Sequence, residues 1–69
     1  MSQMIETMTI NELTDELRAL GIRTSNQKTR AAIKQGKYPF AIHIEMKDDE
    51  FEIYRKLFEK WVEERANPQ

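Results

Sequence analysis

The large apolar residues of this chain follow a helical spacing, then a strict alternation, then a helical spacing again. The first set recurs three or four residues apart and consists of Ile10, Leu13, Leu17 and Leu20. The alternating set consists of Phe40, Ile42, Ile44 and Met46, followed after a polar stretch by Phe51 and Ile53. The last set consists of Leu57, Phe58, Trp61 and Val62. The pattern predicts a helix, a two-stranded hairpin and a C-terminal helix over about 55–66.

The first helix, expected over about 10–20, has clear signals at both ends. Thr9 and Glu12 have the spacing of a capping box, in which the hydroxyl and the carboxylate each accept a backbone amide of the other residue. Gly21 stands where a residue in the left-handed conformation commonly ends a helix.

A second, shorter helix is expected over about 26–35. Ser25 is the preferred N-cap, with Thr24 as the competing choice. Gly36 would end the helix, and Pro39 prevents its continuation. The inward face of this helix would consist of Thr29, Ala32 and Ile33. The opposite face would consist of Gln27, Arg30, Ala31 and Lys34.

The simplest register of the hairpin pairs Ile44 with Ile53 on the core face, around a polar turn at 47–50. This register has one unfavourable feature, because it places Glu45 opposite Glu52 on the outer face.

Length and composition predict one small domain of the α+β class. We expect a flexible lead-in at 1–7, the domain at 8–66 and a tail at 67–69. The 69 residues include no cysteine, no apolar run long enough to span a membrane and no signal-peptide pattern. These features predict a soluble cytoplasmic protein that is not a membrane protein.

No residue pattern indicates catalysis or metal binding. His43 is the only histidine, and the acidic run 48–50 lacks the spacing of a calcium loop. Ser25 and Thr29 have no base nearby in the sequence. We therefore expect no enzyme activity, no metal, no cofactor and no small-molecule ligand.

Charge is distributed very unevenly along the chain. The segment 22–38 carries five basic residues and no carboxylate, whereas the segments on either side each have a net charge of −3 and the total is −1. Five surface lysines and arginines are often only a solvated face. Concentrated on the second of two adjacent helices, they favour contact with the phosphates of duplex DNA.

The order helix, turn, basic helix, hairpin, helix is that of a winged helix-turn-helix domain. In that arrangement the second helix lies in the major groove, with its N-terminal residues near the base edges. The predicted DNA-binding residues are Arg23, Thr24, Ser25, Asn26, Gln27, Lys28, Arg30, Lys34 and Lys37. Tyr38, just after them, could either contact phosphate or pack in the core, and we expect Phe40 to be in the core.

The chain contains the passages MTINELTDELRALGI, SNQKTRAAIKQGKYPFAIHI and FEIYRKLFEKWVEE. In these three passages it resembles small winged-helix proteins of phages and integrative elements. These proteins are similar to excisionases and to the DNA-binding domain of mercury-resistance-type regulators. The resemblance covers about residues 8–64. It implies sequence-specific binding to double-stranded DNA, either to direct site-specific recombination toward excision or to regulate transcription. By position it implies recognition residues at Ser25, Asn26, Gln27, Lys28, Arg30 and Lys34.

Two features depart from that family. The connector 22–25 is about two residues longer than the expected tight turn, and the hairpin turn is acidic at Asp48, Asp49 and Glu50. Phosphate would repel such a turn, so that either Lys47 alone contacts DNA or the turn faces a protein, such as an integrase or another copy of the chain. This leaves an alternative function, a non-catalytic protein-binding module of the anti-repressor kind on the same fold.

Overall fold

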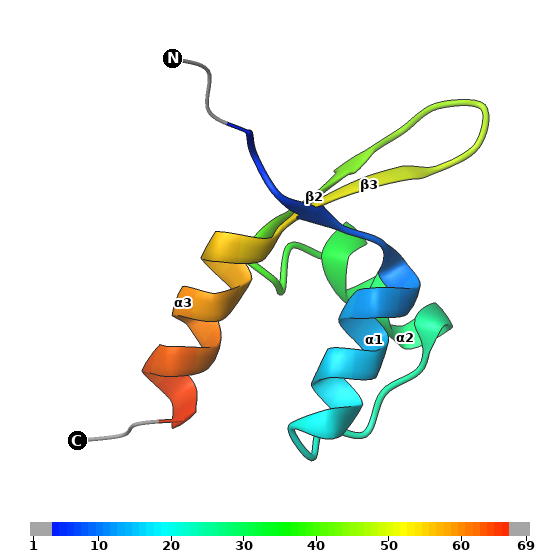
Figure 1. Ribbon diagram of the computed structural model, residues 1–69. Coiled ribbons are helices and arrows are strands. Elements are labelled where there is room, and N and C mark those ends of the chain that lie inside the picture. The colour runs from blue at the N-terminus through cyan, green and yellow to red at the C-terminus, as the bar shows by residue number, and fades with distance from the viewer. Residues whose placement is uncertain (1–3, 67–69) are drawn as a thin grey trace.

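The structure, a computed structural model, describes residues 4–66, so that the tail expected at 67–69 and the start of the expected lead-in lie outside it. The described residues form a small α+β domain of three helices and a three-stranded antiparallel sheet (Figure 1). Its elements are β1 (Thr7–Met8), α1 (Ile10–Ala19), α2 (Asn26–Lys34), β2 (Ala41–Ile44), β3 (Glu50–Tyr54) and α3 (Arg55–Ala66). None of these helices has the length and apolar character needed to cross a membrane.

Both ends of α1 form as expected. The Thr9 hydroxyl accepts the Glu12 amide at 3.0 Å, and the Glu12 carboxylate accepts the Thr9 amide at 2.9 Å, which completes the capping box. Gly21 follows the helix with a φ of +91°, in the left-handed region. Leu20, the last residue of the helical apolar set, is the C-cap residue and is 49% exposed.

The bounds of α2 agree with the expected helix to within one residue. The Ser25 side chain accepts the amide of Lys28 at 3.2 Å and is the N-cap, and Gly36 has a φ of +72° beyond the C-terminal end. Thr29 and Ile33 are buried as predicted. The four residues expected to point outward are all exposed, namely Gln27, Arg30, Ala31 and Lys34.

The sheet contains one strand that the sequence did not indicate. In β1, Thr7 pairs with Tyr54 and Met8 with Ile53, which gives the strand order β1-β3-β2. Thr7 falls within the segment expected to be a lead-in. A strand of two residues has no periodicity to detect, and its partners lie at the other end of the chain.

The register of the β2–β3 hairpin differs from the predicted one by three residues, and that prediction is wrong. Ile53 pairs with Ala41 rather than with Ile44. Because three is an odd number, the shift turns the side chains of β2 to the opposite face. Ile42 and Met46, both expected in the core, are consequently 46% and 61% exposed.

The physical reason for the error lies at Phe40. Its side chain is buried, at 1% exposure, but it precedes β2 and sits in a turn, so its burial is out of phase with the strand. The observed register also places Glu52 opposite Ile42 instead of Glu45. The unfavourable pair of like charges in the expected register is thereby avoided.

The core draws side chains from all three helices, from β1 and β3 and from the turn before β2. Among the residues that the structure describes it consists of Met8, Leu13, Leu17, Ile33, Phe40, Ile53 and Phe58. Trp61 lies partly exposed at its edge, with ring centroids 5.2 Å from Phe40. Tyr38 stacks on Phe40 with ring centroids 5.0 Å apart and meets the edge of Trp61 at 5.8 Å.

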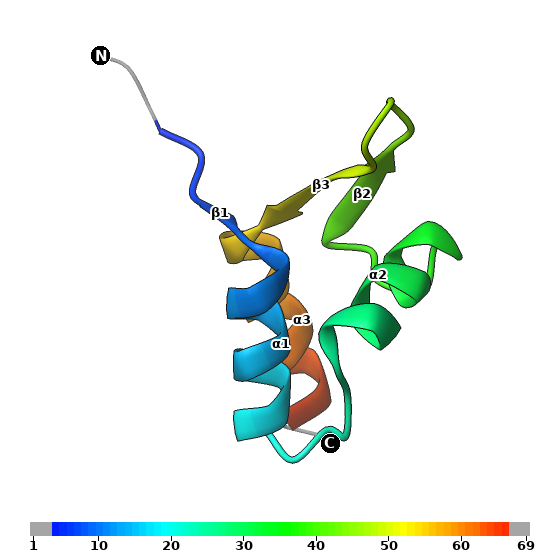
Figure 2. The same ribbon diagram turned by 90° about the vertical axis from the view of Figure 1, so that its right-hand side faces the viewer.

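Two polar contacts fix the helices around this core. The hydroxyls of Thr14 on α1 and Thr29 on α2 lie 2.9 Å apart in a buried position. The Arg55 guanidinium, at the start of α3, donates to the Glu16 carboxylate of α1 at 3.1 Å. Figure 2 shows the resulting arrangement, with α2 beneath the β2–β3 hairpin and α1 and α3 on the other side of the molecule.

Candidate nucleic-acid interface

The outward face of α2 is polar and positively charged, and the helix contains no carboxylate. Gln27 in the first turn and Arg30 at the middle of the helix are exposed, and within residues 4–66 their side chains make no hydrogen bond or ion pair. Ala31 lies beside Arg30 on the same face and adds little bulk. The face therefore offers long donor groups that a partner could approach closely.

Three of the predicted site residues stabilise the start of α2 instead of pointing freely outward. The Asn26 side chain donates to the Asn11 side chain of α1 at 3.2 Å. The Thr24 hydroxyl lies 3.3 Å from the Thr29 hydroxyl, and the Ser25 hydroxyl caps the helix. The Asn26–Asn11 hydrogen bond positions α2 against α1, and the other two contacts hold the connector against the start of α2.

The connector between α1 and α2 carries further positive charge. Lys28 Nζ donates to the carbonyl of Arg23 at 3.1 Å, which ties the connector to the first turn of α2. Arg18 and Arg23 line a hollow of about 310 Å³, together with Gly21, Ile22 and Thr24. Sequence reasoning missed Arg18 because it belongs to an acidic segment, although its place in the last turn of α1 could have indicated that it lies beside the connector.

The C-terminal end of α2 is in contact with the acidic hairpin loop. Lys34 Nζ lies 2.7 Å from Asp49 Oδ2, and the other oxygen of Asp49 lies 3.1 Å from His43 Nε2 on β2. The hydrogen bond from Lys34, and secondarily that from His43, holds the pKa of Asp49 below its ordinary value. We call this arrangement the Lys34–Asp49–His43 bridge. No local sequence signal indicates this bridge, because it depends on the hairpin register and the path of the loop.

Lys37 and Tyr38, which lie just beyond the C-terminal end of α2, differ in their surroundings. Lys37 is exposed, beyond the helix end, and its side chain makes no hydrogen bond or ion pair with other residues in the range 4–66. Tyr38 is half-buried between Phe40 and Trp61, and its burial raises the pKa of the phenol. Of the two alternatives for Tyr38, packing against the core is the one that the structure shows.

The predicted site residues thus fall into two groups. Arg23, Gln27, Arg30 and Lys37 present exposed side chains. The others are engaged within the molecule, namely Thr24, Ser25, Asn26, Lys28 and Lys34. Arg23, Gln27 and Arg30 lie between the connector and the middle of α2, whereas Lys37 lies beyond the C-terminal end, where the hairpin loop contacts the helix.

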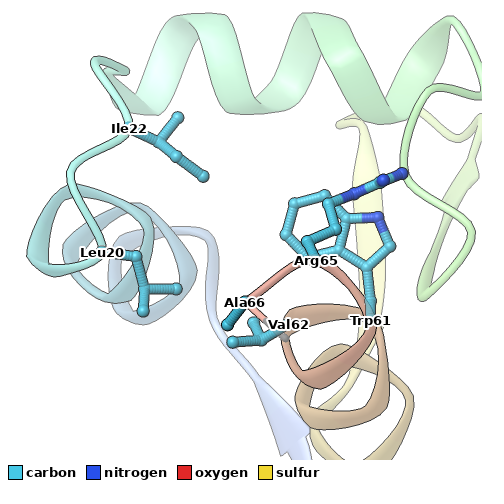
Figure 3. Close-up of a pocket in the computed structure, with 6 residues that line it drawn as sticks. All are labelled: Leu20, Ile22, Trp61, Val62, Arg65 and Ala66. Atoms are coloured by element: carbon cyan, nitrogen blue, oxygen red, sulfur yellow. The ribbon is translucent and has the colours of Figure 1, made fainter. Parts of the chain in front are cut away.

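A different hollow lies between the end of α1 and the last turns of α3. It measures about 160 Å³, and Figure 3 shows Leu20 and Ile22 facing Val62 and Ala66 across it. The Arg65 guanidinium lies over the Trp61 ring, 4.8 Å from its centroid. The lining is apolar apart from Arg65, and it lacks the convergent polar groups that mark a ligand site.

No protein-family model, no curated protein and no solved structure matches this chain. Within residues 4–66, no three side chains among histidine, aspartate and glutamate gather closely enough to hold a metal ion. The candidate interface is therefore supported by the exposure, charge and geometry of α2 and its surroundings.

Proposed function

We propose that this protein is a non-catalytic, sequence-specific duplex-DNA-binding protein with a winged-helix fold. The observation that carries the proposal is the exposed face of α2, where Gln27 and Arg30 have no partner within the described residues and no carboxylate occurs between 22 and 38. A polar helix face on which Arg30 has no carboxylate partner suits the phosphate backbone, and Gln27 and Arg30 also suit base edges.

The geometry of the helix pair supports this use of α2. The Thr14–Thr29 contact and the Asn11–Asn26 hydrogen bond hold α2 against α1 by its inward side, so that the outward face remains open. In helix-turn-helix proteins the N-terminal residues of the second helix contact base edges. Gln27 would contact adenine and Arg30 guanine, the bases that these side chains bind bidentately.

The biological role follows from the resemblance to small winged-helix proteins of phages and integrative elements. We propose either an excisionase, which directs recombination toward excision, or a small transcriptional regulator. Both roles require duplex DNA binding, and an integrase or a second copy of the chain would be the protein partner.

A salt series of duplex-DNA binding tests the proposal. The logarithm of the affinity should fall with the logarithm of salt concentration, with a slope of about 0.9 for each phosphate contact. The variant Arg30→Gln should weaken binding, whereas Lys60→Gln, an equal charge change on an exposed residue of α3, should not. Folded protein that binds neither random nor genomic fragments at low salt would refute the proposal.

A second function is favoured by the acidic hairpin loop, which carries Asp48, Asp49 and Glu50. The same fold could bind a protein with basic side chains, as an anti-repressor-like module. If the protein has that function, it should show no salt-dependent affinity for DNA. It should bind its protein partner, and this binding should be lost when Asp48 and Glu50 are neutralised. The DNA-binding series therefore separates the two functions.

A further inference from the structure

The hairpin loop and α2 make a direct ionic contact on the proposed DNA-binding face. Lys34 is one of the four outward residues of α2, and its ammonium group lies 2.7 Å from the Asp49 carboxylate. This is the distance of a charge-assisted hydrogen bond of the kind that lysine also makes with phosphate oxygens. The Asp49 carboxylate thus binds the Lys34 ammonium group where a phosphate oxygen would otherwise bind.

The carboxylate of Asp49 is held from a second side as well. Its other oxygen lies 3.1 Å from His43 Nε2, and the His43 ring lies against Phe51, with centroids 5.2 Å apart. His43 is 21% exposed and belongs to β2, so it presents a fixed donor to the loop. Two partners at once restrict the carboxylate more than a single exposed lysine would.

We propose that Asp49 is an intramolecular competitor of DNA phosphate for Lys34, and that it thereby limits the affinity of the α2 face for DNA. This inference rests on the proposed function. In the free protein Lys34 is engaged by Asp49, and a phosphate that binds Lys34 has to displace the carboxylate. Arg30 and Gln27 have no such competitor, so the contribution of the N-terminal half of α2 is unaffected.

The loop offers a matched control for this proposal. Asp48 is adjacent to Asp49, is exposed and carries the same charge, but within the described residues it makes no ion pair. Both Asp48→Asn and Asp49→Asn remove one negative charge from the loop. Only Asp49→Asn also releases Lys34.

The experiment measures duplex-DNA affinity at low salt for wild type, Asp48→Asn and Asp49→Asn, each with Lys34 intact and with Lys34→Gln. With Lys34 present, Asp49→Asn should raise the affinity about two- to fivefold, the effect expected from loss of one exposed ion pair. Asp48→Asn should raise it less. In the Lys34→Gln background the two aspartate variants should have equal effects.

The possible results separate this inference from the proposed function. If Asp48→Asn and Asp49→Asn raise the affinity equally in both backgrounds, the loop acts only by general repulsion and the inference is overturned, while DNA binding stands. If Asp49→Asn leaves the affinity unchanged, Lys34 does not meet phosphate and the inference is again overturned. If all six folded proteins fail to bind DNA, the proposed function falls and the inference falls with it.

Discussion

Thr29 is a polar residue in the core, and its hydroxyl connects the two helices of the proposed DNA-binding unit. It is fully buried, and its oxygen lies 2.9 Å from that of Thr14 and 3.3 Å from that of Thr24. A buried hydroxyl without a partner is costly, so this pairing favours one position of α2 against α1. The direction in which the Arg30 side chain leaves the molecule depends on that position.

Thr29→Val should lower the free energy of unfolding by about 1–3 kcal/mol, because it leaves the buried Thr14 hydroxyl without its partner. Thr14→Val combined with Thr29→Val should cost less than the two single changes added together, since neither hydroxyl then remains. Chemical denaturation of the three variants measures this, and strictly additive costs would show that the hydroxyls are not coupled.

The pKa of Asp49 should be measurably below its ordinary value of 3.8 in the folded protein, because Lys34 and His43 both stabilise the carboxylate. A lowered folded-state pKa means that the bridge stabilises the fold above the pKa of the unfolded chain and is lost as the pH falls through the folded value. An NMR titration of the Asp49 carboxyl should show the pKa rising in Lys34→Gln. An unchanged pKa in that variant would show that the two side chains do not pair in solution.

The elements of this protein differ in how far local sequence specifies them. Thr9, Ser25, Gly21 and Gly36 signal the ends of α1 and α2 through contacts within a few residues, and the structure confirms them. The division of α2 into an inward and an outward face is confirmed as well, since it follows from helical geometry alone.

The hairpin and the bridge could not be predicted in the same way. Phe40 fits the alternating pattern in the sequence, but it lies in the turn before β2 and its side chain is buried there. The periodicity therefore predicted the wrong register. The contact between Lys34 and Asp49 joins a helix to a loop, and no short-range signal determines where a loop of five residues at 45–49 will fold. These long-range features required the structure.

Arg30 in α2 and Lys37 beyond its C-terminal end should contribute to DNA binding in different ways. Arg30 projects from the outward face near the N-terminal half, whereas Lys37 lies beyond the helix end. Arg30→Ala should cost about 1–3 kcal/mol on the preferred site and reduce the preference for that site, as loss of a base contact does. Lys37→Ala should weaken all sequences alike. Affinities for a selected and a scrambled duplex measure both effects, and uniform losses from both variants would count against base reading by Arg30.

At the scale of the whole molecule, the basic segment that contains α2 lies beside an acidic hairpin. The segment 22–38, which contains α2, carries five basic residues and no acidic ones, while both flanking segments are net acidic. In Figure 2 the hairpin, which carries much of the acidic charge after residue 38, lies above α2, whereas α3 carries four basic and three acidic residues. The local positive charge of the connector and of α2 would orient the domain toward a polyanion, although the net charge is −1.

The whole domain depends on a small core with Phe40 near its centre. The Phe40 ring contacts Tyr38, Phe58 and Trp61 and is only 1% exposed. Phe40→Ala should lower the free energy of unfolding by about 3–5 kcal/mol, a large part of the stability of a domain this small. Leu57→Ala on the half-exposed side of α3 should cost far less. Thermal melts compare the two, and similar losses would show that Phe40 is not central to the core.

Titration of isotope-labelled protein with duplex DNA, followed by backbone amide NMR, tests most directly whether α2 meets DNA. We predict that the largest shifts occur at the connector and the N-terminal half of α2, around Arg23, Gln27 and Arg30. Smaller shifts should occur at the hairpin loop as Lys34 leaves Asp49, and amides on the exposed side of α3 should not respond. Shifts confined to α1 and α3, or no shifts at low salt from a folded sample, would contradict DNA binding through α2.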